Sequence, residues 1–235
     1  KQKAESGTRW RWGEMAPRGL KNALRKTAPA ILKRNGSYKT FQSKKTEKKL
    51  RGLTKLLEKH LWSKGVLPVE ARRADVSIRD YGTWKGEKGG QYRGMRVDQQ
   101  LTRLINGGGP AVLREGPKML KLTKMALSAL ARRGLKGVLA QRSTLCEAQG
   151  VGTAADILAY DKKKNVMVVV EVKCGYDRFR TASAVSYGRD CKMQAPCSRA
   201  SDCNVHRHMA QLAVTHLMLS RERDMLKQVG DLGIS

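Results

Sequence analysis

The stretch GTAADILAYDKKKNVMVVVEVKC, residues 152–174, decides the fold. Two runs rich in Val, Ile, Leu and Ala flank a polar tract at 161–165, which is the pattern of two strands joined by a tight turn. The second run, 166–172, is apolar on both faces except at Glu171, so we expect a buried central strand. A carboxylate in such a strand must be paired, protonated or bound to a metal.

The register of this hairpin predicts which side chains meet. If the chain reverses between Lys163 and Lys164, Asp156 lies directly across from Glu171. Opposed Cβ atoms on one face of a sheet are about 4.5–5.5 Å apart, and Lys173 shares that face because side chains alternate. Two carboxylates this close raise each other's pKa unless a cation lies between them. Carboxylate and carbonyl oxygens suit Mg²⁺, and a neighbouring ammonium would orient a metal-bound water.

An Asp, a hairpin and Glu-x-Lys together resemble the core of the PD-(D/E)XK nuclease superfamily, and are most similar to its RecB-like and phage- or virus-type exonuclease branch. The G-x-x-x-D strand matches 152–157, and the E-x-K strand matches 170–175. In these nucleases a later helix carries a Gln that faces the site, which corresponds to Gln211. They often have Tyr four residues after it, where this chain has Thr215.

The resemblance extends upstream to a helix that begins near a glycine and matches 93–101, with Asp98 where His is common. It covers roughly 90–222. It implies an α/β fold of the α+β kind, in which a restriction-endonuclease-like core has a mixed central sheet flanked by helices.

The resemblance also implies Mg²⁺- or Mn²⁺-dependent hydrolysis of DNA phosphodiester bonds, by an endonuclease or an exonuclease. The residues expected to take part in catalysis are Asp156, Glu171, Lys173, Gln211 and Glu147. Of these, Glu147 is either an additional acid upstream of the Asp or a surface residue. The metal would be held by Asp156, Glu171 and the carbonyl oxygen of Val172.

The charge of the chain indicates a polyanionic partner. The 235 residues contain 48 Lys and Arg against 20 Asp and Glu, a formal net charge of +28. This balance predicts binding to DNA, RNA or an anionic membrane surface. No apolar run approaches the length of a membrane span, and the scarcity of Phe argues against an RNA-recognition-motif platform. The resemblance implies DNA rather than RNA as the partner.

Several basic segments are candidates for nucleic-acid contact. The first 60 residues hold 18 Lys and Arg against 4 Asp and Glu. Within them Arg and Trp alternate, which suits phosphate contact with base stacking, although a solvated tail has the same composition. Other candidates lie at the hairpin turn and in the long loop that follows the E-x-K strand. The candidates are Arg9, Trp10, Arg11, Trp12, Lys162, Lys163, Lys164, Arg178 and Arg180.

The composition predicts two parts. Residues 1–89 form a basic N-terminal extension, helical or disordered, with one amphipathic helix at 46–62, and residues 90–235 form the nuclease-like domain. Within that domain we expect helices at 97–105, from Pro117 onward and at 204–223, and a first strand at 137–148.

The chain has five cysteines, an odd number without a secretory leader, which favours reduced thiols and an intracellular compartment. Cys191, Cys197 and Cys203 are evenly spaced but lack a C-x-x-C pair, so we expect free thiols there rather than an iron–sulfur or zinc site.

Two other functions fit the same residues. A non-catalytic nucleic-acid-binding protein, such as an organellar ribosome component or a viral genome-associated protein, would use the basic surface without cutting. A restriction-type or junction-resolving enzyme would use the same core as a dimer.

Overall fold

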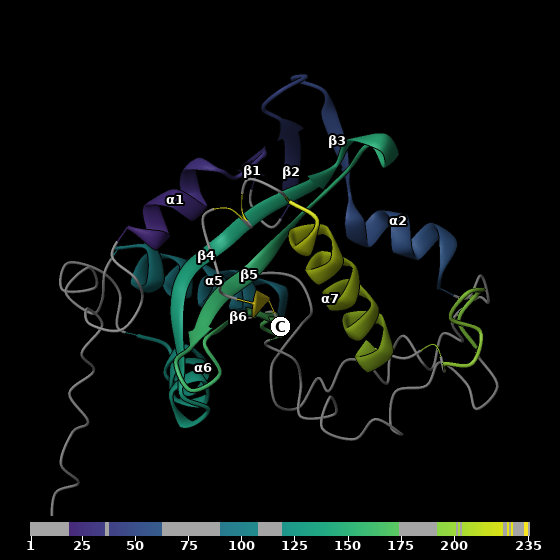
Figure 1. Ribbon diagram of the computed structural model, residues 1–235. Coiled ribbons are helices and arrows are strands. Elements are labelled where there is room, and N and C mark those ends of the chain that lie inside the picture. Colours follow the sequence, from purple (N-terminus) through teal and green to yellow (C-terminus); the bar gives the residue numbers. More distant parts are fainter. Residues whose placement is uncertain are drawn as a thin grey trace, which may run out of the picture.

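The computed structural model describes residues 19–35, 38–62, 90–107, 119–173, 192–200, 202, 204–222, 225, 227 and 233–234. Its helices are α1 (Leu20–Lys26), α2 (Leu53–His60), α5 (Gly90–Gly107), α6 (Lys121–Arg132) and α7 (Asn204–Ser220). Its strands are β1 (Ala30–Asn35), β2 (Tyr38–Ser43), β3 (Lys49–Gly52), β4 (Leu135–Cys146), β5 (Val151–Asp161), β6 (Val166–Val170) and β7 (Gly233–Ile234). A 3₁₀ turn, η2 (Glu147–Gln149), follows β4 (Figure 1).

The strands form one mixed sheet with β5 at its centre. Antiparallel β4 covers one edge of β5 along its whole length. The other edge is shared, because β3 pairs in parallel with the start of β5 and β6 pairs antiparallel with its end. The two partners therefore leave β5 open between residues 152 and 157, the segment that carries Asp156.

Helices cover both faces of this sheet, as expected for a mixed α/β fold. On one face α1 and α7 pack over buried Leu158 and Met167. On the other face α5 and α6 pack over Ile157 and Ala159. Neighbouring residues of β5 thus enter opposite cores, which agrees with a strand that is apolar on both faces.

The register of the β5–β6 hairpin confirms the sequence prediction. Asp161 pairs with Val166 and Ile157 pairs with Val170, so the chain reverses between Lys163 and Lys164. The turn is held by Asp161, whose Oδ1 accepts hydrogen bonds from the backbone N–H groups of Lys163 and Lys164. An Asp that bonds to the N–H two residues later is a local turn signal.

The N-terminal region, on the far side of the expected boundary at residue 89, contributes three strands to the sheet that contains β5. Strands β1, β2 and β3 form an antiparallel meander, and Arg51 and Gly52 of β3 pair with Val151 and Gly152 of β5. The helix expected at 46–62 begins only at Leu53, because 49–52 form β3.

Glycine is required at position 152, where Phe41 of β2 packs closely against β5. A Cβ atom placed on Gly152 would lie 2.5 Å from Cβ and 2.7 Å from Cγ of Phe41. Phe41 is buried against Leu50 and Ala154. Close packing between the N-terminal meander and β5 therefore depends on a residue without a side chain.

The remaining helices agree with the sequence in type, with shifted ends. The helix expected at 97–105 is α5, that expected after Pro117 is α6, and that expected at 204–223 is α7. Strand β4 begins and ends two residues before the expected 137–148. Among the helices that the structure describes, none is both long and apolar enough to cross a membrane.

Candidate active-site cleft

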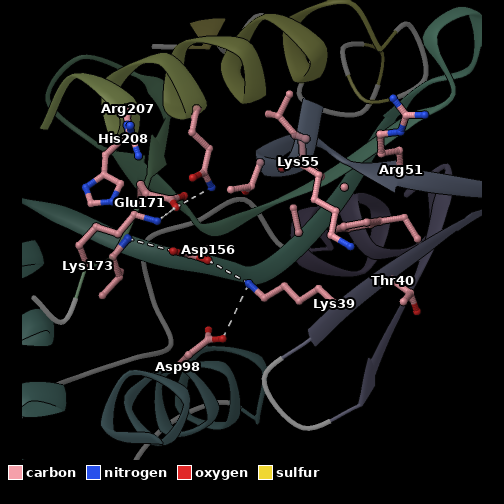
Figure 2. Close-up of a pocket in the computed structure, with 18 of the residues that line it drawn as sticks. Lys39, Thr40, Arg51, Lys55, Asp98, Asp156, Glu171, Lys173, Arg207 and His208 are labelled. Carbon is pink, nitrogen blue, oxygen red and sulfur yellow. Dashed lines mark hydrogen bonds and ion pairs between the residues drawn. The ribbon is translucent and has the colours of Figure 1, made fainter. Parts of the chain in front are cut away.

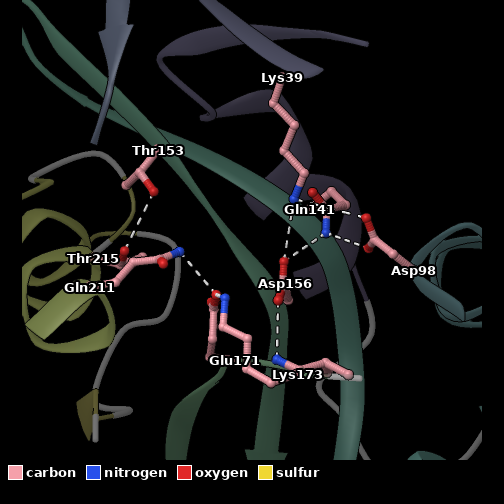
Figure 3. Close-up of polar contacts among 10 residues, drawn as sticks. Lys39, Asp98, Gln141, Thr153, Asp156, Glu171, Lys173, Gln211 and Thr215 are labelled. Carbon is pink, nitrogen blue, oxygen red and sulfur yellow. Dashed lines mark hydrogen bonds and ion pairs between the residues drawn. The ribbon is translucent and has the colours of Figure 1, made fainter. Parts of the chain in front are cut away.

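Asp156 and Glu171 meet where the hairpin register predicts. Glu171 directly follows β6, and the pairing of Ile157 with Val170 places it opposite Asp156. The backbone N–H of Val172 donates a hydrogen bond of 3.0 Å to Oδ2 of Asp156. Nζ of Lys173 lies 2.5 Å from Oε1 of Glu171. The two acids and the amine thus form one cluster (Figure 3).

The electrostatics of the cluster are dominated by Glu171, whose side chain is only 8 % exposed. Burial raises the pKa of Glu171, and the neighbouring charge of Asp156 raises it further. The ammonium groups of Lys173 and Lys39 lower it in part. A further positive charge beside Glu171 would offset both effects and favour its ionised form.

Helix α7 supplies the third side of the cluster. Nε2 of Gln211 donates a 2.9 Å hydrogen bond to Oε1 of Glu171, so the structure brings Gln211 to the acids as expected. Thr215, one turn further on, is buried beside Thr153, with their hydroxyl oxygens 3.5 Å apart. His208, one turn earlier, also lines the cleft. Burial, followed by the charges of Lys173 and Arg207, lowers the pKa of His208 to about 4.

Three residues of the cluster were not predicted as site residues: Lys39, Asp98 and Gln141. Nζ of Lys39 lies 3.4 Å from Oδ1 of Asp156 and 3.8 Å from Oδ2 of Asp98. Nε2 of Gln141 donates to Oδ1 of Asp98 at 2.7 Å and to Oδ1 of Asp156 at 3.1 Å. A cation and an amide thus join two carboxylates that come from α5 and β5 (Figure 3).

Signals for two of these residues were present in the sequence. Lys39 alternates with Phe41 and Ser43, both buried, so it belongs to the inward face of a strand. Asp98 directly follows Val97, an apolar residue that is fully buried on α5.

Gln141 carries no comparable signal, because its position depends on the backbone. It lies in the middle of β4, between the pairs Ala140 with Ile157 and Arg142 with Ala155, and so opposite Asp156. Its φ of 57° is in the left-handed region that residues other than glycine rarely adopt. Strain of this kind concentrates at functional sites, where the surrounding structure holds it in place.

The structure places other predicted residues away from the cluster. Glu147 lies in η2, where its Oε1 accepts a 2.7 Å hydrogen bond from Oγ of Ser43, and it does not line the cleft. Three lysines are exposed at the hairpin turn, at the end of β5 that lies away from its pairing with β3: Lys162, Lys163 and Lys164.

The remaining predicted contacts, Arg9, Trp10, Arg11, Trp12, Arg178 and Arg180, lie outside the described residues. So do Cys191 and Cys203, whereas Cys197 is a free thiol.

The cluster forms the floor of an open cleft of about 950 Å³ (Figure 2). One wall comes from β2, β3 and α2, and the other comes from α7 and the residues after β6. The charged and polar side chains that line it are Lys39, Thr40, Lys49, Arg51, Thr54, Lys55, Asp98, Thr153, Asp156, Glu171, Lys173, Arg207, His208 and Gln211. Cations outnumber acids among them, so the cleft suits an anionic ligand.

The donor set suits a hard divalent cation. Among the described residues, no three His, Cys, Asp or Glu side chains gather closely enough to enclose a metal ion. The available oxygens are those of the Asp156 and Glu171 carboxylates and the carbonyl of Val172, whose peptide N–H already bonds Asp156. Carboxylate and carbonyl oxygens are the ligands of Mg²⁺ and Mn²⁺, and a cation here would offset the burial and the repulsion by Asp156 that raise the pKa of Glu171.

Comparisons with protein-family models, with curated proteins and with solved structures found no match to this chain.

Proposed function

We propose that this protein is a divalent-metal-dependent nuclease that hydrolyses phosphodiester bonds of DNA. One observation carries the proposal: Asp156 faces Glu171 across the hairpin, with Lys173 and Gln211 both bonded to Glu171 on the floor of a cationic cleft. This hairpin resembles the one in PD-(D/E)XK nucleases, which share a restriction-endonuclease-like core. The resemblance supports the same function.

The residues of the cluster would have different roles in catalysis. Asp156, Glu171 and the carbonyl of Val172 would hold Mg²⁺ or Mn²⁺, which when bound offsets the charge that builds on the phosphate during attack by water. Lys173 would direct its ammonium protons to the attacking water and keep it oriented. Gln211 holds Oε1 of Glu171, which fixes the direction of that carboxylate.

Substrate affinity would come from the cations of the cleft and from the net charge of the chain. Contacts between Lys or Arg and phosphates release bound counterions, so affinity should fall steeply as salt rises. Such binding does not depend on base sequence, which suits a nuclease that acts along a backbone.

The test uses Asp156→Asn and Lys173→Ala, with Lys124→Ala as a control that removes an exposed lysine on α6, outside the cleft. Cleavage of plasmid and linear DNA in Mg²⁺ or Mn²⁺ should fall about 100-fold or more in the first two variants and stay near wild type in the control. DNA binding measured in EDTA should persist in all three. Wild-type cleavage by both Asp156→Asn and Lys173→Ala would contradict the proposal.

A second function, non-catalytic nucleic-acid binding, is favoured by the lysines that already contact both acids. Lys39 lies 3.4 Å from Asp156, and Lys173 lies 2.5 Å from Glu171, so the carboxylates have compensating charge within the chain. A binder would show no Mn²⁺ site that is lost on Glu171→Ala in a calorimetric titration, whereas the nuclease would.

A further inference from the structure

We propose that Arg51 and Lys55 form a phosphate-binding subsite for the backbone on one side of the reacting phosphodiester, an inference that takes its ligand from the proposed function. Arg51 lies in β3 and Lys55 in the first turn of α2, and both line the cleft that holds Asp156 and Glu171. Figure 2 shows them on one side of the cleft, with Lys173 and His208 on the other side and Asp156 between.

The β3–α2 wall that carries the subsite, and that also includes Lys49, differs from the rest of the cleft in its free charge. Lys39 contacts Asp156 and Asp98, Lys173 contacts Glu171, and Arg207 contacts Asp202. The exposed side chains of Arg51 and Lys55, by contrast, make no ion pair or hydrogen bond with any residue that the structure describes.

No acid lines the cleft on the β3–α2 wall, from Lys49 to Lys55. Uncompensated cations on one wall of a cleft attract an anion to that wall, because no acid among the described residues neutralises them.

The local sequence fixes both side chains toward solvent. In β3, Leu50 is buried and pairs with Phe41, so Arg51 points the opposite way. In α2, Leu53 and Leu57 are buried, which leaves Lys55 on the open side of the helix. The backbone is anchored as well, since the N–H of Arg51 donates a 2.8 Å hydrogen bond to the carbonyl of Gly150. The two cations are therefore presented from rigid elements rather than from a free tail.

A nucleic-acid backbone matches this arrangement better than a single phosphate does. The scissile phosphate would lie at the acids on the floor, and a neighbouring phosphate of the same strand would reach the β3–α2 wall. The guanidinium of Arg51 can bond two phosphate oxygens at once, and Lys55 adds a point charge. Holding the flanking phosphate would fix the direction in which the strand crosses Asp156 and Glu171.

The experiment compares two double variants with the same loss of charge. Arg51→Gln/Lys55→Gln removes the subsite, and Lys121→Gln/Lys124→Gln removes two exposed cations on α6, outside the cleft. The probe is a fluorescein-labelled single-stranded DNA of about six nucleotides, a length near the lower end of what one single-strand-binding fold covers. Its anisotropy is measured in EDTA over a range of salt concentrations. We expect about 10-fold weaker binding in the subsite variant and less than about twofold in the control, with the salt slope reduced by about 1.4 only in the former.

Equal weakening by the two double variants would overturn the subsite, because it would show only a loss of overall charge. Arg51→Lys/Lys55→Arg should bind within about threefold of wild type, since the charges stay in place. The outcomes separate the two proposals. If the wild-type protein cuts DNA while the two double variants bind DNA equally well, the subsite proposal fails and the nuclease proposal stands. If wild type does not cut but only the subsite pair loses affinity, the nuclease fails and the subsite stands.

Discussion

Val172 donates its backbone N–H to Oδ2 of Asp156 at 3.0 Å, one residue beyond the point where Glu171 faces Asp156. The other oxygen, Oδ1, accepts hydrogen bonds from Nε2 of Gln141 and from Nζ of Lys39. Both oxygens of this carboxylate therefore have fixed neighbours, one from the hairpin backbone and one from β4 and β2. A carboxylate held from two directions is preorganised, so little freedom would be lost when it binds a ligand.

Lys39 should compete with a divalent cation for Asp156. Its ammonium lies 3.4 Å from Asp156 and 3.8 Å from Asp98, and the side chain is 29 % exposed. Removing this charge in Lys39→Met should therefore raise the affinity for Mn²⁺, by about 10-fold, as measured by calorimetric titration without DNA. Lys39→Arg keeps the charge and serves as the control. An unchanged Mn²⁺ affinity in Lys39→Met would show that the ammonium leaves the site when metal binds.

Gln211 should fix the orientation of Glu171. Gln211→Leu removes the 2.9 Å hydrogen bond to Oε1 of Glu171 and leaves a buried carboxylate with fewer partners. Hydrogen bonds to charged groups contribute about 1.5–3 kcal/mol, so cleavage should fall about 10- to 100-fold with a smaller effect on DNA affinity. Steady-state kinetics with a matched Thr215→Val variant, which alters the same helix one turn away, would separate loss of the bond from disturbance of α7.

The hairpin could be predicted from sequence because its information is local. Apolar runs on either side of a polar turn set the register, and the register sets which residues face each other. Asp156, Glu171 and Lys173 followed from that register, and the later helix brought Gln211 to them as the resemblance implied.

Contacts between distant segments were not accessible in the same way. Lys39 is 117 positions from Asp156, and its strand was counted with a basic extension because lysines around it dominate the composition. The hydrogen bonds from Gln141 to Asp98 and Asp156 depend on a backbone conformation at φ 57° that no side-chain pattern specifies. Glu147 was expected either near the acids or at the surface, and its place in η2, just after β4, puts it at the surface beside Ser43.

Glu171 should make the stability of the metal-free chain depend on pH. Its pKa is raised above the ordinary 4.5 by burial first and by Asp156 second, so the folded state favours the protonated form. The stabilising contribution of Glu171 is complete below the unfolded pKa and is lost as pH rises through the raised folded pKa. Glu171→Gln should therefore gain stability over wild type as pH rises from about 4.5, where the two should be alike.

The measurement is urea unfolding of both proteins in EDTA at several pH values. His208 acts in the opposite sense, since its pKa is lowered to about 4 and its contribution is lost as pH falls below 6.5. It is present in both proteins, so the difference between them isolates Glu171. A difference that stays constant with pH would mean that Glu171 titrates alike in the folded and unfolded states.

Arg142 and Glu222 should govern stability without affecting the cleft. The side chain of Arg142 is fully buried in β4, and its Nη2 lies 2.7 Å from Oε2 of Glu222, just after α7. Burial lowers the pKa of Arg142, and Glu222 is the charge that offsets this effect. Glu222→Ala leaves a buried guanidinium uncompensated and should cost about 3–5 kcal/mol in urea unfolding, while DNA affinity of the folded protein stays unchanged. Arg142→Met combined with Glu222→Ala should recover much of that loss, because the uncompensated charge is removed as well. A single Glu222→Ala variant as stable as wild type would show that Arg142 reaches water when its partner is absent.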